Sequence, residues 1–398
     1  MPVGVSLLAL ALGGLAIGTA EFATMGVLPL FAGEMRVSVP SAGYAISGYA
    51  LGVVVGAPLF ALLGARWTRK RLVLWLAAAV AVTNLCTALA WSLPALVLTR
   101  FACGLPHGAY FGTAAVIGSS LVAPERRARA IAQTMMGLMV ANVVGVPAAT
   151  WLGETFGWRS AYVAVGGVAV VTVVAVAALV PPPAVIATEP AESGSDVGRE
   201  LSALRRTQVW LNLLLIAAGF GGMFAVYSYI APILTTLAGY RPEQVPIALA
   251  VFGVGMTLGN WVGGRLADWS PVRATGLGLV ATAVALLAFT VTVHEAVPAT
   301  VTLFLIGFVV IGSTPALTTR LMDAACEGRN LAAALYHSAF NVANAAGASI
   351  GGILIAAGLG YTAPAVAGAV LAGVGLAVLV FSVALGRRRA PVRTVGPS

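Results

Sequence analysis

The chain has 398 residues, of which 60% are hydrophobic and only 9% are charged, and its formal net charge is +9. A soluble protein carries about 25% charged residues, so this composition excludes an ordinary aqueous surface and indicates a membrane protein. The positive charge does not indicate nucleic-acid binding, because the basic residues form short clusters between apolar segments. The three cysteines have neither the spacing of a metal site nor that of a disulfide framework.

Long apolar runs, separated by helix breakers, predict about twelve transmembrane helices, since each crossing needs roughly 20 apolar residues. We expect every span to be helical, because lipid offers no partner for an unpaired backbone group. The first run continues past Glu21 and is too long for a cleaved signal, so it is interpreted as a span. The predicted spans are 5–31, 41–64, 72–90, 94–122, 130–153, 161–180, 209–237, 244–266, 274–293, 297–319, 331–357 and 363–385.

Residues 181–207 are rich in Pro, Glu and Ser and predict a flexible linker. The predicted organisation is an N-terminal six-helix bundle at 1–180, this linker, and a C-terminal six-helix bundle at 208–398 with a short basic tail. If the N-terminus is cytoplasmic, 18 of the 22 basic residues lie in cytoplasmic loops and the tail, and three lie outside. The positive-inside rule therefore predicts two cytoplasmic termini.

The two halves repeat at an offset near 203. Gly56 and Gly259 occupy the same place in spans two and eight, and the pattern Ala-Asn-x-x-Gly occurs at 141–145 and again at 343–347. Chance matches in a chain rich in glycine and alanine are the alternative, but these matches fall in helices of equal rank. A parallel repeat of this kind predicts a substrate site near the bilayer midplane, between the halves.

Glu21 is the one acidic residue of the 13 that lies deep within a predicted span. A carboxylate in lipid is costly and by default marks a functional site, so we expect Glu21 to carry a proton. The alternative is a structural hydrogen bond to a neighbouring helix. Arg100 is the only basic residue deep in a span, at a similar depth, so the two side chains can form an intramembrane pair. The alternative for Arg100 is bonding to backbone carbonyls alone.

Span five carries small residues that allow close helix packing and a proline that bends the helix. A bend at the interface between the halves could also control proton or solute leakage. These residues are Gly137, Gly145, Pro147 and Gly153. His107 lies seven residues after Arg100 and shares its face, although a packing histidine explains it equally well. His337 shares one face with two asparagines of the same span and predicts a cavity wall. The candidate substrate-binding residues are Phe22, Met25, His107, Tyr110, Asn142, Tyr227, Tyr229, His337, Asn341 and Asn344.

The sequence contains no phosphate-binding glycine loop, no paired carboxylates and no metal-ligand cluster. We therefore expect no enzymatic activity, no metal and no cofactor, with a proton gradient as the energy source. A channel is disfavoured, because no segment is typical of a selectivity filter.

Four segments together resemble the major facilitator superfamily, and within it the twelve-helix drug:proton antiporters. They are GTAEFATMGVLP at 18–29, LTRFACGLPHG at 98–108, the span-five glycines at 137–153 and GGRLAD at 263–268. The loop residues that match the superfamily signature are Arg66, Arg69, Lys70, Gly264, Arg265 and Asp268. The first-half loop departs from the signature, since Ala65 stands in place of its aspartate and Thr68 stands in place of a glycine. This departure resembles the chloramphenicol-resistance and arabinose-efflux-like permeases.

The resemblance implies an all-α fold of two pseudo-symmetric six-helix bundles and a proton-coupled exporter that works by alternating access. Glu21 would carry the proton and Arg100 would modulate it, with a small, fairly neutral compound such as chloramphenicol as substrate. Two alternatives stay open: an exporter of a sugar, nucleoside or other metabolite, and a non-transporting receptor or scaffold. We expect a monomer in the bacterial plasma membrane, with substrate, protons and lipid as its partners.

Overall fold

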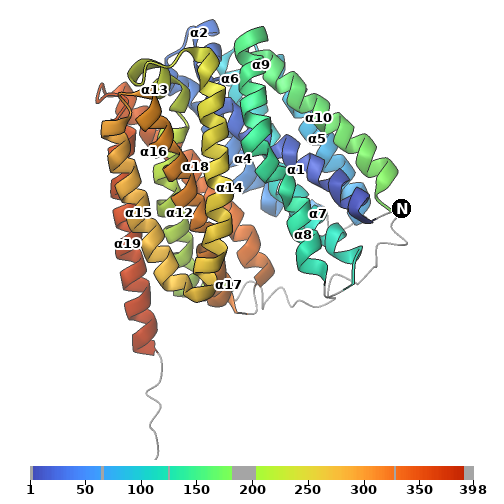
Figure 1. Ribbon diagram of the computed structural model, residues 1–398. Helices are drawn as coiled ribbons and strands as arrows, with labels where there is room; N and C mark the ends of the chain where they lie inside the picture. The colour runs from blue at the N-terminus through green and yellow to red at the C-terminus, as the bar shows by residue number, and fades with distance from the viewer. Residues whose placement is uncertain (1–2, 64–66, 124–125, 182–202, 327–328, 390–398) are drawn as a thin grey trace, which may run out of the picture.

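The computed structural model describes residues 3–63, 67–123, 126–181, 203–326 and 329–389. Throughout these ranges the regular structure is helical, as Figure 1 shows. Helices satisfy their backbone polar groups internally, which is the condition for crossing lipid. The centre of the predicted linker, 182–202, and the predicted loop residue Arg66 lie outside the described residues, so the proposed domain boundary stays a prediction.

The helices form two bundles that follow each other along the chain. The first bundle contains α1 (Val3–Gly26), α2 (Leu28–Glu34), α3 (Val39–Ala42), α4 (Tyr44–Leu63), α5 (Arg69–Ala88), α6 (Leu93–Gly104), α7 (His107–Ser120), α8 (Arg127–Val140), the π-helix η3 (Ala141–Gly145), α9 (Val146–Phe156) and α10 (Trp158–Leu179). The second contains η4 (Ala203–Arg205), α12 (Thr207–Tyr227), α13 (Ile230–Leu237), η5 (Pro242–Gln244), α14 (Val245–Trp269), α15 (Pro271–Thr292), α16 (Ala296–Gly312), α17 (Thr314–Ala325), α18 (Arg329–Ala356) and α19 (Ala363–Arg389).

Eleven helical stretches within the described residues are long and apolar enough to cross a membrane. The remaining predicted span, 94–122, is divided at Leu105–Pro106 into α6 and α7, and neither part is long enough on its own. A proline interrupts a helix because it has no N–H for the carbonyl four residues earlier. With this broken helix the predicted twelve-span, all-α fold is confirmed, and the break lies between Arg100 and His107.

The predicted internal repeat is confirmed by the way glycines pack. On α4 and α14, glycines bring the helix so close to the fourth and the tenth span that an added Cβ would collide with a backbone carbonyl. In the first half Gly52 approaches Phe101 and Gly56 approaches Leu105. The same two contacts recur 203 positions later, where Gly255 approaches Phe304 and Gly259 approaches Phe308.

Replacing Gly259 by alanine is expected to lower the free energy of unfolding by about 1–3 kcal/mol, because the new methyl group meets the Phe308 backbone. Gly264 on the same helix is the matched control, since a Cβ there meets nothing within 4 Å. Alanine at 264 should be neutral or stabilise the helix by up to ~1 kcal/mol. Thermal unfolding in detergent checks the pair, and equal midpoints for the two variants would contradict this packing.

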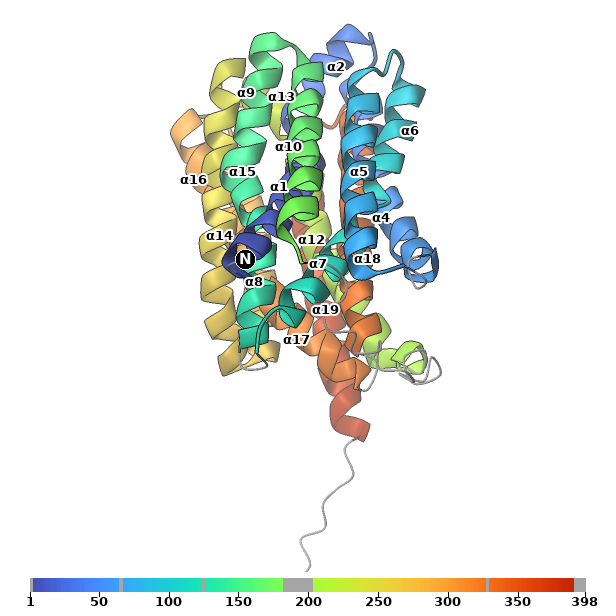
Figure 2. The ribbon, with the colours of Figure 1, turned by 90° about the vertical axis from the view of Figure 1, so that its right-hand side faces the viewer.

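The two halves contact each other along two seams. In one seam α18 packs against α3 and α4, and in the other α14 packs against η3 and α9 (Figures 1 and 2). Ser47 of α4 donates a hydrogen bond to the Ala345 carbonyl at 3.3 Å. At the opposite end, the described parts of α8 and α17 make no comparably extensive contact with the other half, and Figure 1 shows the bundles diverging there. The halves are therefore joined mainly toward the end that carries α2 and α9.

Candidate functional site

Glu21 lies in the unbroken helix α1, and only 3% of its surface is exposed. Asn344 of α18 donates from Nδ2 to its Oε1 at 3.3 Å. A hydrogen bond to a neighbouring helix is the contact expected if the role of Glu21 is purely structural. This bond also crosses from one half of the chain to the other, so a change at the Glu21 carboxyl acts on both halves.

His107, the first residue of α7, is the second neighbour of Glu21. Its Nδ1 lies 3.9 Å from Glu21 Oε2 and 3.0 Å from the hydroxyl of Tyr49 on α4. Pro106 precedes α7, so His107 stands at the first residue of that helix. A continuous chain of polar contacts thus runs through α4, α7 and α1 of the first half and into α18 of the second. Its members are Tyr49, His107, Glu21 and Asn344.

Arg100 is fully buried, and its guanidinium lies over aromatic rings. Its Cζ is 4.3 Å from the centroid of the Tyr49 ring and 5.6 Å from that of Tyr162. None of its three side-chain nitrogens has a hydrogen-bond partner within the described structure. Cation–π contact contributes up to ~2 kcal/mol at a desolvated site, whereas burying an ion costs several kcal/mol. The rings therefore do not compensate for the buried charge.

The structure brings Arg100 and Glu21 into one cluster but does not pair them. No ion pair joins them in the described residues, and the bonds to backbone carbonyls that were the alternative are also absent there. Tyr49 takes the intermediate place, with its ring against Arg100 and its hydroxyl on His107. Arg100 is thus a buried cation with no described hydrogen-bond partner, and it interacts with the Glu21 carboxyl only over more than ion-pair distance.

His337 of α18 faces this cluster from the second half. Its ring centroid is 6.4 Å from that of His107 and 6.5 Å from that of Phe111, with which it is parallel. Of the three residues predicted to form a cavity wall on α18, His337 and Asn344 contact the first half, whereas Asn341 donates to the carbonyl of His337 within its own helix. The carbonyl oxygens of both asparagines are buried and have no partner among the described residues.

Phe22 lies next to Glu21 in sequence and packs into aromatic rings of the second half. Its ring centroid is 6.4 Å from Phe224 and 6.0 Å from Tyr227, which in turn stacks on Phe252 at 4.3 Å. Met25, one turn further along α1, is fully buried in the same apolar cluster. Three candidate substrate residues, Phe22, Met25 and Tyr227, therefore lie on the apolar side of the same junction.

Three other candidates direct their described hydrogen bonds to backbone carbonyls and not to Glu21. Tyr110 donates to the Leu10 carbonyl at 2.9 Å and lies inside the first bundle. Tyr229 donates to the Ala348 carbonyl at 2.8 Å, in the seam between α4 and α18. Asn142 donates to the Leu138 carbonyl of its own helical segment. Sequence position could not separate these residues from the central ones, because the direction of a side chain depends on how each helix is rotated in the bundle.

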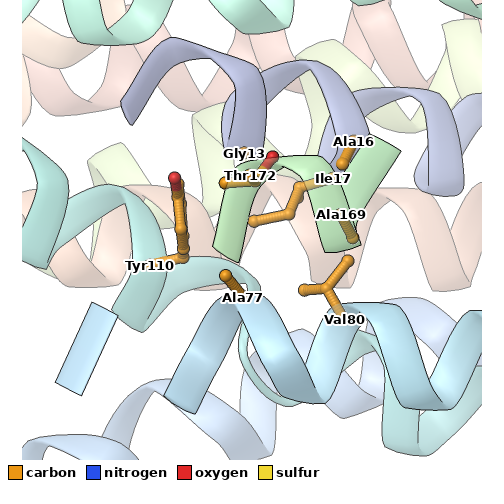
Figure 3. Close-up of a pocket in the computed structure, with 8 residues that line it drawn as sticks. All are labelled: Gly13, Ala16, Ile17, Ala77, Val80, Tyr110, Ala169 and Thr172. Atoms are coloured by element: carbon orange, nitrogen blue, oxygen red, sulfur yellow. The ribbon is translucent and has the colours of Figure 1, made fainter. Parts of the chain in front are cut away.

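Figure 3 shows a small gap beside Tyr110, between α1, α5, α7 and α10 of the first bundle. Apart from Tyr110 and Thr172, its lining side chains are those of small or aliphatic residues such as Ile17 and Val80. The gap has no room for a water molecule. It is a packing defect within one half and does not reach Glu21.

The span-five residues pack along α1, the helix that carries Glu21. An added Cβ at Gly137 would collide with the Ala11 backbone, at Gly145 with the Thr19 side chain, and at Gly153 with Val27. Pro147 stands at the start of α9, directly after the π-helix η3. A proline leaves a carbonyl of the preceding turn without its donor, and π-helical turns are frequent at functional sites.

The predicted loop residues occupy helix ends. Lys70 donates to the carbonyls of Ala177 and Val180, at 2.9 and 2.5 Å, and so closes the C-terminal end of α10, where a cation is favourable. Arg69 begins α5 and is exposed. In the second half Gly264, Arg265 and Asp268 lie in the last two turns of α14. The first-half loop, which lacks the signature aspartate, is thus joined to the end of α10 through Lys70.

Two residues of the site were missed in the sequence. Tyr49 and Tyr162 hold the Arg100 side chain, and Tyr162 also shares a 2.9 Å hydrogen bond with Thr24 of α1. Nothing in the local sequence separates them from other tyrosines in spans. Within the described residues no group of three His, Cys, Asp or Glu is arranged to hold a metal ion.

Comparison with known proteins decides the family. The family model described as Major Facilitator Superfamily matches residues 10–328. The chain belongs to this superfamily. It is 40% identical to the inner membrane transport protein YdhP of Escherichia coli (strain K12) over 382 residues, which are 96% of each chain. It is also 32% identical to a chloramphenicol resistance protein of Streptomyces lividans over 362 residues, 91% of this chain and 90% of that one.

The fold agrees with solved members of the same architecture. A crystal structure of a bacterial homologue of the human lysosomal transporter Spinster, in an inward-facing and occupied conformation, aligns with a TM-score of 0.77 at 19% identity. The alignment covers 97% of this chain and 98% of that one. The chain is thus a multi-pass membrane protein whose relatives and fold are those of major facilitator transporters and not of enzymes.

Proposed function

We propose that this protein is a proton-coupled exporter of a small organic compound and works by alternating access. The observation that carries the proposal is the place of Glu21. It is a buried carboxyl in α1 that touches the second half through Asn344 and the Tyr49–Arg100 cluster through His107. An ionisable residue within a membrane bundle is functional by default, and this one lies where the halves meet.

Proton binding at Glu21 would alter the contact between the halves. The ionised carboxylate can only accept hydrogen bonds, so it takes one from Asn344 Nδ2. A protonated carboxyl can also donate, and the Asn344 carbonyl oxygen has no other partner in the described structure. An acid and an amide can then bond to each other twice, so the proton adds a bond between α1 and α18. The contact between the halves would therefore differ between the ionised and the protonated carboxyl, and such a difference is what couples proton binding to a change of conformation.

The conformation and orientation of the protein belong to the same proposal. We place both termini in the cytoplasm and the protein in the bacterial inner membrane, because the basic residues cluster in one set of loops and because the relative YdhP is named as an inner membrane protein. The seams between the halves then lie toward the outer side, and the diverging ends with α8 and α17 toward the cytoplasm. This arrangement supports a state that receives substrate from the cytoplasm.

Both walls of the site come from one chain, so a monomer suffices.

The proton gradient is sufficient for useful export. One proton that crosses ~100 mV releases ~2.3 kcal/mol. Since ~1.4 kcal/mol corresponds to one decade, one proton per substrate sustains roughly a 40-fold concentration gradient. A neutral aromatic compound with hydroxyl groups would fit this site. Its ring could stack on Phe22 and Tyr227, and its hydroxyl groups could donate to the unpaired asparagine oxygens.

A susceptibility panel in an efflux-deficient host tests the function, with chloramphenicol as the first compound because a relative is named for resistance to it. Expression should raise the inhibitory concentration of at least one compound, and an uncoupler should remove the protection. Radiolabelled sugar and nucleoside efflux, measured in parallel, tests the metabolite alternative. Absence of solute or proton flux in all of these assays would favour the non-transporting receptor or scaffold.

A further inference from the structure

The outer surface of α14 carries an alternation of tryptophan and arginine at its C-terminal end. Trp261, Arg265 and Trp269 follow each other at intervals of four residues, so they lie on one face of the helix. Arg273 follows in the first turn of α15. All four side chains are exposed, and the two indoles are 62% and 60% exposed. We call these four residues the Trp–Arg ladder.

The arginines of the ladder are held against its indole rings. Arg265 Cζ lies 3.6 Å from the centroid of the Trp261 ring, and Arg273 Cζ lies 5.1 Å from that of Trp269. Neither guanidinium forms an ion pair within the described residues. Asp268, the acidic residue next to the ladder on α14, is exposed and lies at the edge of this face. Two fixed positive charges are therefore free to meet an anion.

The same face of α14 continues toward the middle of the membrane as an apolar stripe. Leu258 and Val254 lie in line with Trp261 and Arg265 by helical spacing, and they are 45% and 38% exposed. Ile247 continues this line but lies about 27 Å from Arg265 along the axis, in the opposite leaflet. No other described helix covers them, so in a bilayer they face acyl chains. Trp261 and Trp269 are about 12 Å apart along the axis at 1.5 Å per residue, which is more than the roughly 5–7 Å thickness of one headgroup region, so the pair extends from the headgroups to the edge of the hydrocarbon.

We propose that the Trp–Arg ladder binds an anionic phospholipid. Its phosphate would accept hydrogen bonds from Arg265 and Arg273, and its acyl chain would lie along the apolar stripe. Charge complementarity supports this occupant, because guanidinium groups bind phosphate in a bidentate geometry. Depth supports it as well, since an apolar stripe that ends in tryptophans and arginines matches the order of acyl chain and headgroup in one leaflet.

Native mass spectrometry of the purified full chain tests the site, with phosphatidylglycerol as probe and phosphatidylcholine as the zwitterionic comparison. The test variant is R265Q/R273Q, in which both charges are removed and the polar character is kept. The matched control is R71Q, since Arg71 lies 5.7 Å from a single indole, that of Trp67, outside the ladder. Thermal unfolding of each variant shows that it is folded.

The wild-type protein should bind phosphatidylglycerol more tightly than phosphatidylcholine. The double variant should weaken phosphatidylglycerol binding by roughly 30-fold, from the typical contribution of two arginines at a membrane surface, and R71Q should leave the tightest site unchanged. Equal binding of the two lipids by the wild type would overturn the proposal. So would undiminished phosphatidylglycerol binding by the double variant, or an equal loss in R71Q.

Discussion

The variant Glu21→Gln is expected to lose proton-driven transport. Glutamine has the size of glutamate and can still accept the hydrogen bond of Asn344, but it cannot bind and release a proton. In inverted vesicles with an imposed proton gradient, substrate accumulation should fall from as much as roughly 40-fold to none. Glu295→Gln is the control, because Glu295 is an exposed carboxylate before α16 and makes no side-chain cap there.

Substrate exchange separates loss of coupling from loss of the fold in this variant. Exchange of internal for external substrate needs both halves to alternate but consumes no proton gradient. Glu21→Gln should therefore retain exchange while it loses accumulation. Accumulation at the wild-type level in Glu21→Gln would refute the proposed role of this carboxyl.

The variant Arg100→Met is expected to be more stable than the wild type and unable to couple transport to protons. Arg100 is a buried charge whose nitrogens have no hydrogen-bond partner in the described structure. Removing a buried ion that has no hydrogen-bond partner recovers its desolvation penalty of several kcal/mol, and the cation–π contact with Tyr49 that is lost contributes up to ~2 kcal/mol. We therefore expect a net gain of about 1–2 kcal/mol in the free energy of unfolding.

Arg100→Lys is the matched variant, since it keeps the charge and loses the planar stacking on Tyr49. It should gain no stability. Thermal unfolding in detergent and proton-driven uptake measure the two effects on the same preparations. A marked loss of stability in Arg100→Met would show that the guanidinium has a strong partner in the resting state, contrary to this structure.

Features that depend on composition and periodicity were predictable from the sequence. The twelve spans follow from apolar runs, and the repeat was visible in the spacing of glycines such as Gly56 and Gly259, which pack alike in the two halves. The burial of Glu21 follows from its depth within a span. These properties are set by the solvent, because lipid requires long apolar helices whatever their neighbours.

Contacts between helices were not predictable in the same way. Asn344 and Glu21 are 323 positions apart, and their hydrogen bond depends on the rotation of α1 and α18 about their axes. The predicted ion pair of Arg100 and Glu21 rested on equal depth alone, and the structure places the ring of Tyr49 against Arg100 instead. Tyr229 was assigned to the substrate cavity because it is a polar group in a span, whereas it lies in the seam between the halves.

Infrared difference spectroscopy of the purified protein can show, without any substrate, whether Glu21 takes up and releases a proton. The C=O stretch of a protonated carboxylic acid is separate from that of an ionised one. As the pH is raised, the wild-type protein should lose one such band that Glu21→Gln lacks, while Glu295→Gln behaves as the wild type. Identical spectra of the wild type and Glu21→Gln at every pH would contradict the account.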